Sequence, residues 1–403
     1  MNGGTGDGAS VVASDEWRLD QLTFGTERGV AHAHSYYDIP VIDGGGRRVI
    51  AHRLTFERRH PTAGEAVEVG LVDIDEPGSW TPLGDSRAWS WQQGPLAQWI
   101  GGGPRVTWAD REDGRLVGRM LDVETGASST IERPLYAVAP DGRFALALDM
   151  GRIDVLRPGY GFFTGEGRPA NRAPDDEGVW RVDLDTGAAR LILPLSDAAA
   201  FLERALGPFA RLRLRMMRPH FWFNHVKISP DGGRFTVKLR WRKPDGHWDD
   251  RQGVSLTAGT DAGEEPALLA RATSHVIWMD PDRLHLWQGK HGRIVEVRDE
   301  VPRGRPLGDF AAGAITVNAH LRRLDGERFV WDTPYRETID LNVIDRSTGR
   351  SLRIARFAGH EPARGPFRCD LHPCPSADGR RIVVTSLQDG ARQVYALTRI
   401  GEG

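Results

Sequence analysis

The chain alternates between short apolar runs and polar turns, and one such unit recurs along its length. Each copy has an apolar run, a turn with Gly or Asp beside a basic residue, and a second apolar run. Turns of this chemistry between two short apolar runs predict an antiparallel β-hairpin. The seven copies span residues 39–53, 98–110, 136–149, 226–239, 276–287, 321–332 and 372–386.

A second kind of turn separates these hairpins, but it occurs only six times. The seventh unit ends at residues 393–400 without a return strand, and the segment at residues 17–24 could supply one. A four-stranded unit repeated seven times, with the last completed by the N-terminus, is how a β-propeller closes its ring. We therefore predict an all-β chain: a single seven-bladed β-propeller over residues 17–403, closed by an N-terminal strand, after a flexible tail over residues 1–16. The six second turns lie in residues 72–83, 121–131, 182–193, 256–269, 295–307 and 343–354.

One interval between hairpins is long and predicts a partly helical insertion between blades three and four, at about residues 195–218. Ser196 is a candidate N-cap, and Gly207-Pro208 would end the helix near residues 204–206. The insertion is basic, and its arginines fit either a solvated helix face or an anion site. They are Arg211, Arg213, Arg215 and Arg218.

The charge balance removes one class of partner. The chain has 53 Lys and Arg against 55 Asp and Glu, a formal net charge of −2, so no whole-molecule field favours nucleic acid or an anionic membrane. Two cysteines are too few for a disulfide framework and favour a reducing compartment. No apolar run reaches the roughly 18 residues of a membrane-spanning helix. We expect a cytoplasmic protein with no nucleic-acid or membrane partner.

Polar residues recur just before the first strand of each blade, where a propeller surrounds its central pocket. Five of these seven segments carry a histidine, and the other two supply Gln93 and Arg133, with Gln92 and Tyr136 beside them. Neutral imidazoles bind divalent metals, and the Cys369-x-x-His372-x-Cys374 spacing adds possible ligands. Each histidine taken singly could instead bond a neighbouring strand. The five are His34, His225, His275, His320 and His372.

Aromatic side chains at the same rim suit the flat faces of sugars. Tyr36 and Trp222 are examples, although Trp222 could equally pack between blades. Paired carboxylates, which glycoside hydrolysis needs, are scarce there, with Asp38 and Asp370 as the clear candidates. The sequence has no Gly-rich phosphate loop, nucleophile elbow or HExxH motif.

The segments at residues 224–235, 274–287 and 370–397, with the entry strand at 17–24, resemble the oligogalacturonate lyases, cytoplasmic seven-bladed propellers. The resemblance implies a manganese-like ion held by His and Gln side chains, with His275 and His372 at matching positions. Cys374 and Cys369 stand where the family has a further His and a Gln, which shifts preference toward zinc. The family's base and its arginine partner would fall near His225 and Arg218.

These observations predict a lyase that cleaves an acidic, uronic-acid-containing oligosaccharide by metal-assisted β-elimination. We expect His225, with its ordinary pKa near 6.5, to be the base. Alternatives are a glycoside hydrolase that uses Asp38 and Asp370, and a propeller that binds glycan or protein without chemistry. The expected roles are as follows: Arg218 and Arg133 as carboxylate partners, His275, His320, His372 and Cys374 as ligands of manganese or zinc, and Tyr36, Gln93, His34 and Trp222 as substrate contacts.

Overall fold

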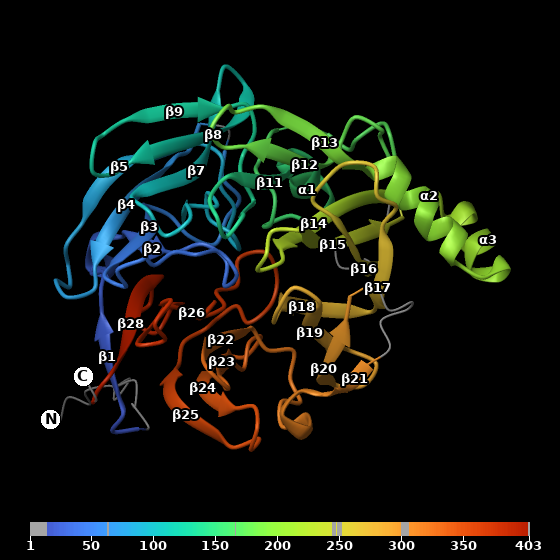
Figure 1. Cartoon of the computed structure of the whole chain (residues 1–403). Coiled ribbons are helices and arrows are strands. Elements are labelled where there is room, and N and C mark those ends of the chain that lie inside the picture. Colours follow the sequence, from blue (N-terminus) through green and yellow to red (C-terminus); the bar gives the residue numbers. More distant parts are fainter. Residues whose placement is uncertain are drawn as a thin grey trace, which may run out of the picture.

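The predicted hairpins pair into seven four-stranded antiparallel sheets arranged as a ring (Figure 1). The computed structural model describes residues 14–62, 64–165, 167–243, 247, 252–299 and 306–401. In Figure 1 the first strands of blades four to six, β14, β18 and β22, lie nearer the centre of the ring than the last strands of the same blades, β17, β21 and β25. The predicted all-β, seven-bladed propeller is therefore confirmed. Most of the tail predicted for residues 1–16 lies outside the described residues.

Blades one to three take up the N-terminal half of the chain. Blade one contains β2 (Ala31–Ala33), β3 (Arg48–Leu54), β4 (Val67–Asp73) and β5 (Thr81–Ser86); blade two contains β6 (Gln98–Trp99), β7 (Arg105–Glu112), β8 (Arg115–Asp122) and β9 (Ser128–Ile131); blade three contains β10 (Ala137–Val138), β11 (Phe144–Leu148), β12 (Gly178–Asp183) and β13 (Ala189–Pro194). A short 3-10 helix, η1 (Thr26–Arg28), precedes β2.

Blades four to seven follow the insertion. Blade four contains β14 (His220–Ile228), β15 (Arg234–Arg242), β16 (Gln252–Gly259) and β17 (Ala267–Arg271); blade five contains β18 (Thr273–Trp278), β19 (Arg283–Gln288), β20 (Arg293–Arg298) and β21 (Pro306–Asp309), followed by the 3-10 helix η2 (Phe310–Gly313). Blade six contains β22 (Leu321–Asp325), β23 (Arg328–Asp332), β24 (Ile339–Asp345) and β25 (Ser351–Phe357); blade seven contains β26 (Cys374–Pro375), β27 (Arg381–Ser386), β28 (Gln393–Arg399) and β1 (Trp17–Gln21).

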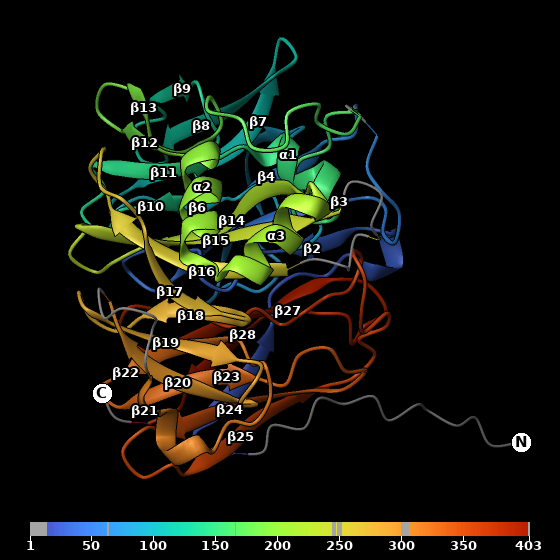
Figure 2. The same ribbon diagram turned by 90° about the vertical axis from the view of Figure 1, so that its right-hand side faces the viewer.

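The N-terminal strand closes the ring, as predicted. β1 pairs antiparallel with β28, with Trp17 opposite Arg399 and Gln21 opposite Tyr395. The two strands lie side by side in Figures 1 and 2. Trp17 is buried in a cluster with Leu341 and Leu397. The closure thus joins chain ends that are far apart in sequence and removes a free sheet edge.

This closure predicts a specific stability loss. Trp17→Ala removes the large buried side chain of β1 and should lower the free energy of unfolding by about 3–5 kcal/mol. Arg18→Ala on the same strand is the control, because its side chain is mostly exposed, at 60%, and should cost under about 1 kcal/mol. Urea unfolding of both variants checks this. Equal stability of the two would contradict the closure.

Two inner strands, β14 and β18, each have a break in their pairing with the next strand of the blade. β14 shifts register against β15 between Asn224 and Lys227, and β18 shifts against β19 between Ser274 and Ile277. Such bulges leave a residue unpaired and re-aim its side chain. The broken segments hold residues with left-handed backbone, namely His225 (φ 58°) and His275 (φ 45°), and His372 before β26 has φ 49°.

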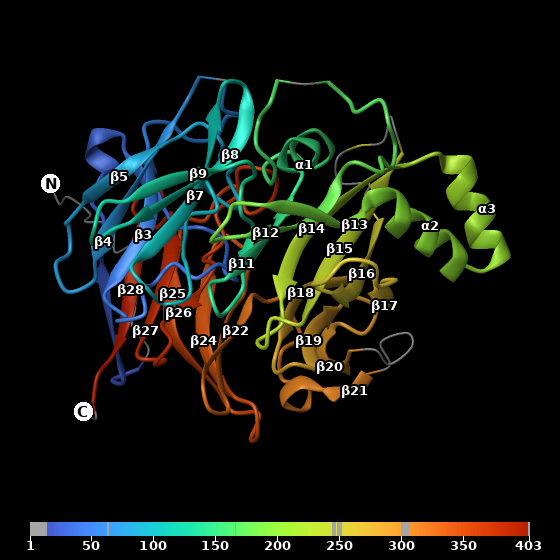
Figure 3. The same ribbon diagram turned by 45° about the horizontal axis from the view of Figure 1, so that its top comes forward.

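The helical insertion differs in part from its prediction. α2 (Leu195–Ala205) begins one residue before Ser196 and has no side-chain cap bond, so Ser196 is not its N-cap. Gly207-Pro208 ends that helix but also starts a second one, α3 (Pro208–Met217), because Pro is well tolerated in the first helical turn. Both project from the outer side of the ring (Figure 3). A further helix, α1 (Met150–Leu156), lies between β11 and β12.

Two of the insertion's arginines hold α2 and α3 together. Arg211 donates hydrogen bonds to the backbone carbonyl oxygens of Glu203, Arg204 and Leu206 at 2.8–3.1 Å, which satisfies the unpaired C-terminal end of α2. Arg215 forms an ion pair with Glu203 at 2.9 Å. Among the described residues, no helix is long and apolar enough to cross a membrane.

Candidate active site

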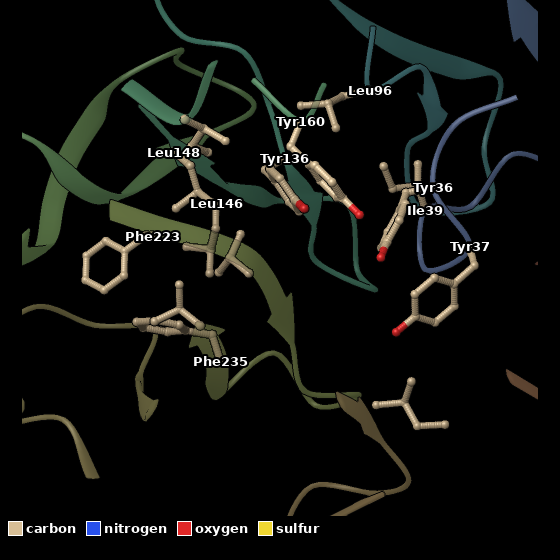
Figure 4. Close-up of a cluster of buried hydrophobic side chains, with 14 of the residues drawn as sticks. Tyr36, Tyr37, Ile39, Leu96, Tyr136, Leu146, Leu148, Tyr160, Phe223 and Phe235 are labelled. Atoms are coloured by element: carbon tan, nitrogen blue, oxygen red, sulfur yellow. The ribbon is translucent and has the colours of Figure 1, made fainter. Parts of the chain in front are cut away.

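Two adjacent tyrosines lie at the centre of the ring. They come from the loop after β2, where the inner strand of blade one is interrupted, and both are buried. Figure 4 shows the Tyr36 and Tyr37 side chains reaching into the space that Tyr136 and Tyr160 also face. These rings form a platform around which the polar side chains of the other blades gather.

Four of the five predicted histidines surround this platform. Tyr36 stacks on His225 with ring centroids 4.9 Å apart and meets His372 edge-on at 4.5 Å. The ring centroid of His320 lies 4.8 Å from that of Tyr37 and 4.2 Å from that of His275. Blades four, five, six and seven thus each contribute one imidazole to the centre of the ring.

His225 makes two hydrogen-bond contacts that define its tautomer. Its Nδ1 lies 3.0 Å from Tyr136 Oη, and its Nε2 lies 3.3 Å from Arg157 Nη1. Because a guanidinium can only donate, Nε2 is the acceptor and Nδ1 carries the proton. Gln93 donates to the same Tyr136 hydroxyl. Burial and the nearby Arg157 charge hold the pKa of His225 well below its ordinary value, which corrects the expected value near 6.5.

A second group of side chains has the composition of a metal site. One ligand atom each from His320, Asp370 and His372 lie within 4.8 Å of one another, and all three residues are buried. Asp332 accepts a hydrogen bond from His320 Nδ1 at 2.9 Å, which leaves Nε2 to face the group. Such carboxylate–histidine pairs orient metal-bound imidazoles.

The unpaired imidazole nitrogens support this assignment. Nε2 of His320 and Nε2 of His372 are buried and, among the described residues, have no hydrogen-bond partner. An unpaired buried polar atom is costly unless a ligand satisfies it. Burial, together with the neighbouring His320, holds the pKa of His372 well below its ordinary value, so its nitrogens are free of the extra proton that would exclude a metal.

His320 has the opposite pKa shift. Burial opposes its protonation, but the charge of Asp332 and their hydrogen bond outweigh burial and raise its pKa. His275 lies beside the group with Nδ1 2.8 Å from the Ala319 carbonyl oxygen and Nε2 3.4 Å from Tyr335 Oη. His34 is also buried, and its Nδ1 faces the Ser35 carbonyl oxygen at 2.7 Å.

Cys374 does not belong to the metal group. Its thiol is buried and donates to the Ile39 carbonyl oxygen at 3.4 Å, and burial raises its pKa. Cys369 is likewise buried with its pKa raised to about 12, and neither is in a disulfide. A metal needs the thiolate form. Asp370 lies in the donor group where a cysteine was expected. The group therefore has nitrogen and oxygen ligands and no sulfur ligand, and such a set suits manganese as well as zinc.

Three other expected site residues lie elsewhere. The Arg133 guanidinium stacks 3.4 Å from the Trp180 ring centroid and 3.5 Å from Asp149. Arg218 is the exposed residue that ends α3. Trp222 is fully buried in the hydrophobic core and is a packing residue. The sequence could not place them because their neighbours come from distant segments.

The arginine that contacts His225 comes instead from the loop after α1, and a second arginine, Arg368, lies beside Asp370 of the donor group. Arg157 follows α1 and donates to Asn224 Oδ1 at 2.9 Å as well as facing His225. Arg368 donates to Asp370 at 2.7 Å and to Tyr160 Oη at 2.6 Å. The only sequence signal was the motif Pro-Gly-Tyr-Gly at residues 158–161, in which two glycines flank a tyrosine.

Side chains fill most of the centre. A cavity of about 20 Å³ lies between Tyr37, His225, Lys227 and His275, which is room for about one water-sized ligand. A groove of about 500 Å³ adjoins it through Lys238. A sugar can therefore enter only when the side chains over the central cavity move apart.

Comparisons with known proteins bear on the fold. No family model and no curated protein matches the chain. An oligogalacturonate lyase in complex with manganese is similar at a TM-score of 0.60 and 15% identity, covering 97% of this chain and 96% of that chain. An oligogalacturonate lyase from Vibrio parahaemolyticus is similar at 0.59 and 12% identity, with the same coverage. The propeller domain of a Pyrococcus furiosus protease is similar at 0.50 and 11% identity, covering 92% and 96%. The chain therefore has a seven-bladed propeller fold like that of the oligogalacturonate lyases over nearly its whole described length.

Proposed function

We propose that this protein is a lyase that cleaves a uronic-acid-containing oligosaccharide by β-elimination. The observation that carries the proposal is that His225, beside Arg157, and the donor group of His320, Asp370 and His372 both lie against the Tyr36 ring, through His225 and His372. The likeness of the fold to the two lyases supports it.

The reaction removes a weakly acidic proton next to a carboxylate and expels the glycosidic oxygen. It needs a neutral base within hydrogen-bond reach of that proton. Burial holds the pKa of His225 well below its ordinary value, so its ring is neutral, and its Nε2 lone pair takes the proton once Arg157 turns from it to the substrate carboxylate. It also needs positive charge at the substrate carboxylate, since a free negative charge opposes carbanion formation. Arg157 supplies such a charge beside the base.

A divalent ion fits the donor group of two imidazoles and one carboxylate. His320 Nε2, His372 Nε2 and an Asp370 oxygen would hold it, and Asp332 fixes the orientation of His320. When bound, the ion would supply further positive charge to the substrate carboxylate. Manganese or zinc suits this set of nitrogen and oxygen ligands.

The hydrolase alternative has less support. Hydrolysis needs one carboxyl group as proton donor and a second carboxylate as base or nucleophile. Asp38 forms an ion pair with Lys227 at 2.8 Å, and Asp370 forms one with Arg368 at 2.7 Å. Each carboxylate therefore already has a cationic partner, and Asp370 also belongs to the metal-type group.

A substrate screen tests the proposal. The metal-loaded protein is incubated with oligomers of several uronic acids and with neutral oligosaccharides of similar length as controls. We expect ultraviolet absorbance of a conjugated unsaturated sugar to grow with at least one uronate and with no neutral sugar, because only uronates have the acidic proton. Absence of this absorbance with every uronate would overturn the proposal.

A further inference from the structure

In the loop after α1, close backbone packing restricts the position of Tyr160 beside the candidate site. A Cβ at Gly161 would lie 1.9 Å from the Asp154 backbone nitrogen, and one at Gly159 would lie 2.9 Å from Pro366. Only glycine fits both positions, and Gly159 also has a left-handed φ of 90°. Tyr160 between them is therefore fixed by backbone packing on both sides.

Hydrogen bonds fix the same loop. The Gly159 carbonyl oxygen accepts from the Gln92 backbone N–H at 3.0 Å, and the Phe162 N–H donates to Met150 O at 3.0 Å. Phe162 is completely buried. A tyrosine held this firmly at a site is pre-organised, which is what proton transfer in a short-lived complex requires.

Two arginines surround the Tyr160 ring. Arg368 Nη2 donates to its hydroxyl at 2.6 Å, and the Arg157 guanidinium lies 3.5 Å from the ring centroid. The ring meets His225 edge-on, with centroids 5.6 Å apart. The same Arg157 faces Nε2 of His225. The tyrosine and the histidine thus share one arginine and lie next to each other.

We propose that Tyr160 is the general acid of the elimination, donating its phenolic proton to the departing glycosidic oxygen while His225 takes the carbon-bound proton. This inference rests on the proposed lyase function and adds a second catalytic residue to it. The proton lost and the oxygen expelled are attached to neighbouring carbons of the sugar. Two groups only a few ångströms apart are therefore what the reaction needs.

The proposed step balances in atoms and electrons. The C–H bond breaks, its proton goes to Nε2 of His225, and its electron pair forms the carbon–carbon double bond. The bond from carbon to the glycosidic oxygen breaks, and its electron pair stays on that oxygen, which takes the proton from Tyr160 Oη. The resulting imidazolium and phenolate then exchange one proton, directly or through water, which restores both residues without a further reagent.

Electrostatics agrees with this division of roles. Burial alone would raise the pKa of Tyr160, but the charges of Arg157 and Arg368 outweigh burial and lower it to about 8. Tyr160 thus keeps its proton at neutral pH but gives it up more readily than an ordinary phenol, whereas His225 is neutral and accepts one. Environments that push two pKa values apart define an acid and a base. The charged and titratable groups that face Tyr160 are Arg157, Arg368, Asp370, Tyr335, Tyr36, Tyr136 and His225.

The test compares Tyr160→Phe with two substrates of one uronate: the natural oligomer, and an analogue whose leaving group at the same carbon needs no proton, such as a nitrophenolate. We expect a loss of about 10²–10⁴-fold in turnover on the oligomer and a loss at least an order of magnitude smaller on the analogue. Tyr395→Phe, which also removes a tyrosine hydroxyl but one bonded to Asp389, is the control and should keep wild-type turnover.

The pH profile gives a second result that a purely structural role would not change. An acid works in its protonated form, so wild-type turnover should fall as the pH rises through about 8, and this fall should be absent from Tyr160→Phe. Equal losses on both substrates, or a wild-type rate that rises through pH 8, would overturn the inference alone. No elimination by the wild type on any uronate would overturn the proposed function and the inference with it.

Discussion

His225→Asn should lower turnover by about 10²–10⁴-fold, the usual cost of losing a general base. Asparagine is the chosen replacement because it tolerates the left-handed backbone at this position (φ 58°), so the bulge in β14 is kept. An amide cannot accept the proton as imidazole does. Steady-state kinetics on the best uronate from the screen checks the effect, with metal content measured on the same sample.

A second buried histidine is the matched control. His285 in β19 faces Glu296 at 3.0 Å and lies outside the central group. His285→Asn should lower the melting temperature but leave the turnover of folded protein near the wild-type value. If His225→Asn behaves in the same way, with lost stability and retained turnover, His225 is a structural residue and not the base.

His372→Gly should abolish tight binding of the divalent ion. His372 contributes Nε2 to the donor group, and this atom has no hydrogen-bond partner among the described residues, so no hydrogen bond of that nitrogen is lost with the side chain. Glycine is compatible with its φ of 49°. We expect close to one equivalent of manganese or zinc in the wild type and almost none in the variant, with turnover falling in parallel.

The control for metal binding is His52→Ala. His52 is a buried histidine of β3 that does not belong to the donor group, and its variant should keep the metal. Elemental analysis after purification without chelator measures both. Equal metal in wild type and His372→Gly, or no metal in the wild type after loading, would contradict the assigned site.

The ring could be predicted from the sequence because its signals are local. Each blade is marked by short apolar runs and a turn, and the missing seventh return strand pointed to residues 17–24, which contain the whole of β1. The rim histidines followed from the same repeat: His225 and His275 lie at the bulges inside β14 and β18, and His320 and His372 lie just before β22 and β26.

The partners of these histidines could not be predicted. Arg157 and Tyr160 come from a loop inside blade three, and Arg368 comes from the segment before blade seven. The contact between them depends on how these two segments fold over the ring. The rim position favoured Arg133 and the family resemblance favoured Arg218, but both lie in other surroundings. The Cys-x-x-His-x-Cys spacing favoured Cys374 as a metal ligand. Its thiol instead donates a hydrogen bond to the Ile39 carbonyl oxygen, and Asp370 belongs to the donor group.

The central claim is that the glycosidic bond is broken by elimination and not by hydrolysis. The most direct test is cleavage of a uronate oligomer in water enriched in heavy oxygen, followed by mass spectrometry of the products. Elimination keeps the glycosidic oxygen on the departing sugar and adds no water. With the new reducing end trapped by borohydride reduction at once, before its anomeric oxygen exchanges with water, we expect one unsaturated product, lighter by one water than a hydrolysis product, and no heavy oxygen in either fragment at the cleaved bond. Saturated fragments that carry heavy oxygen would contradict the account.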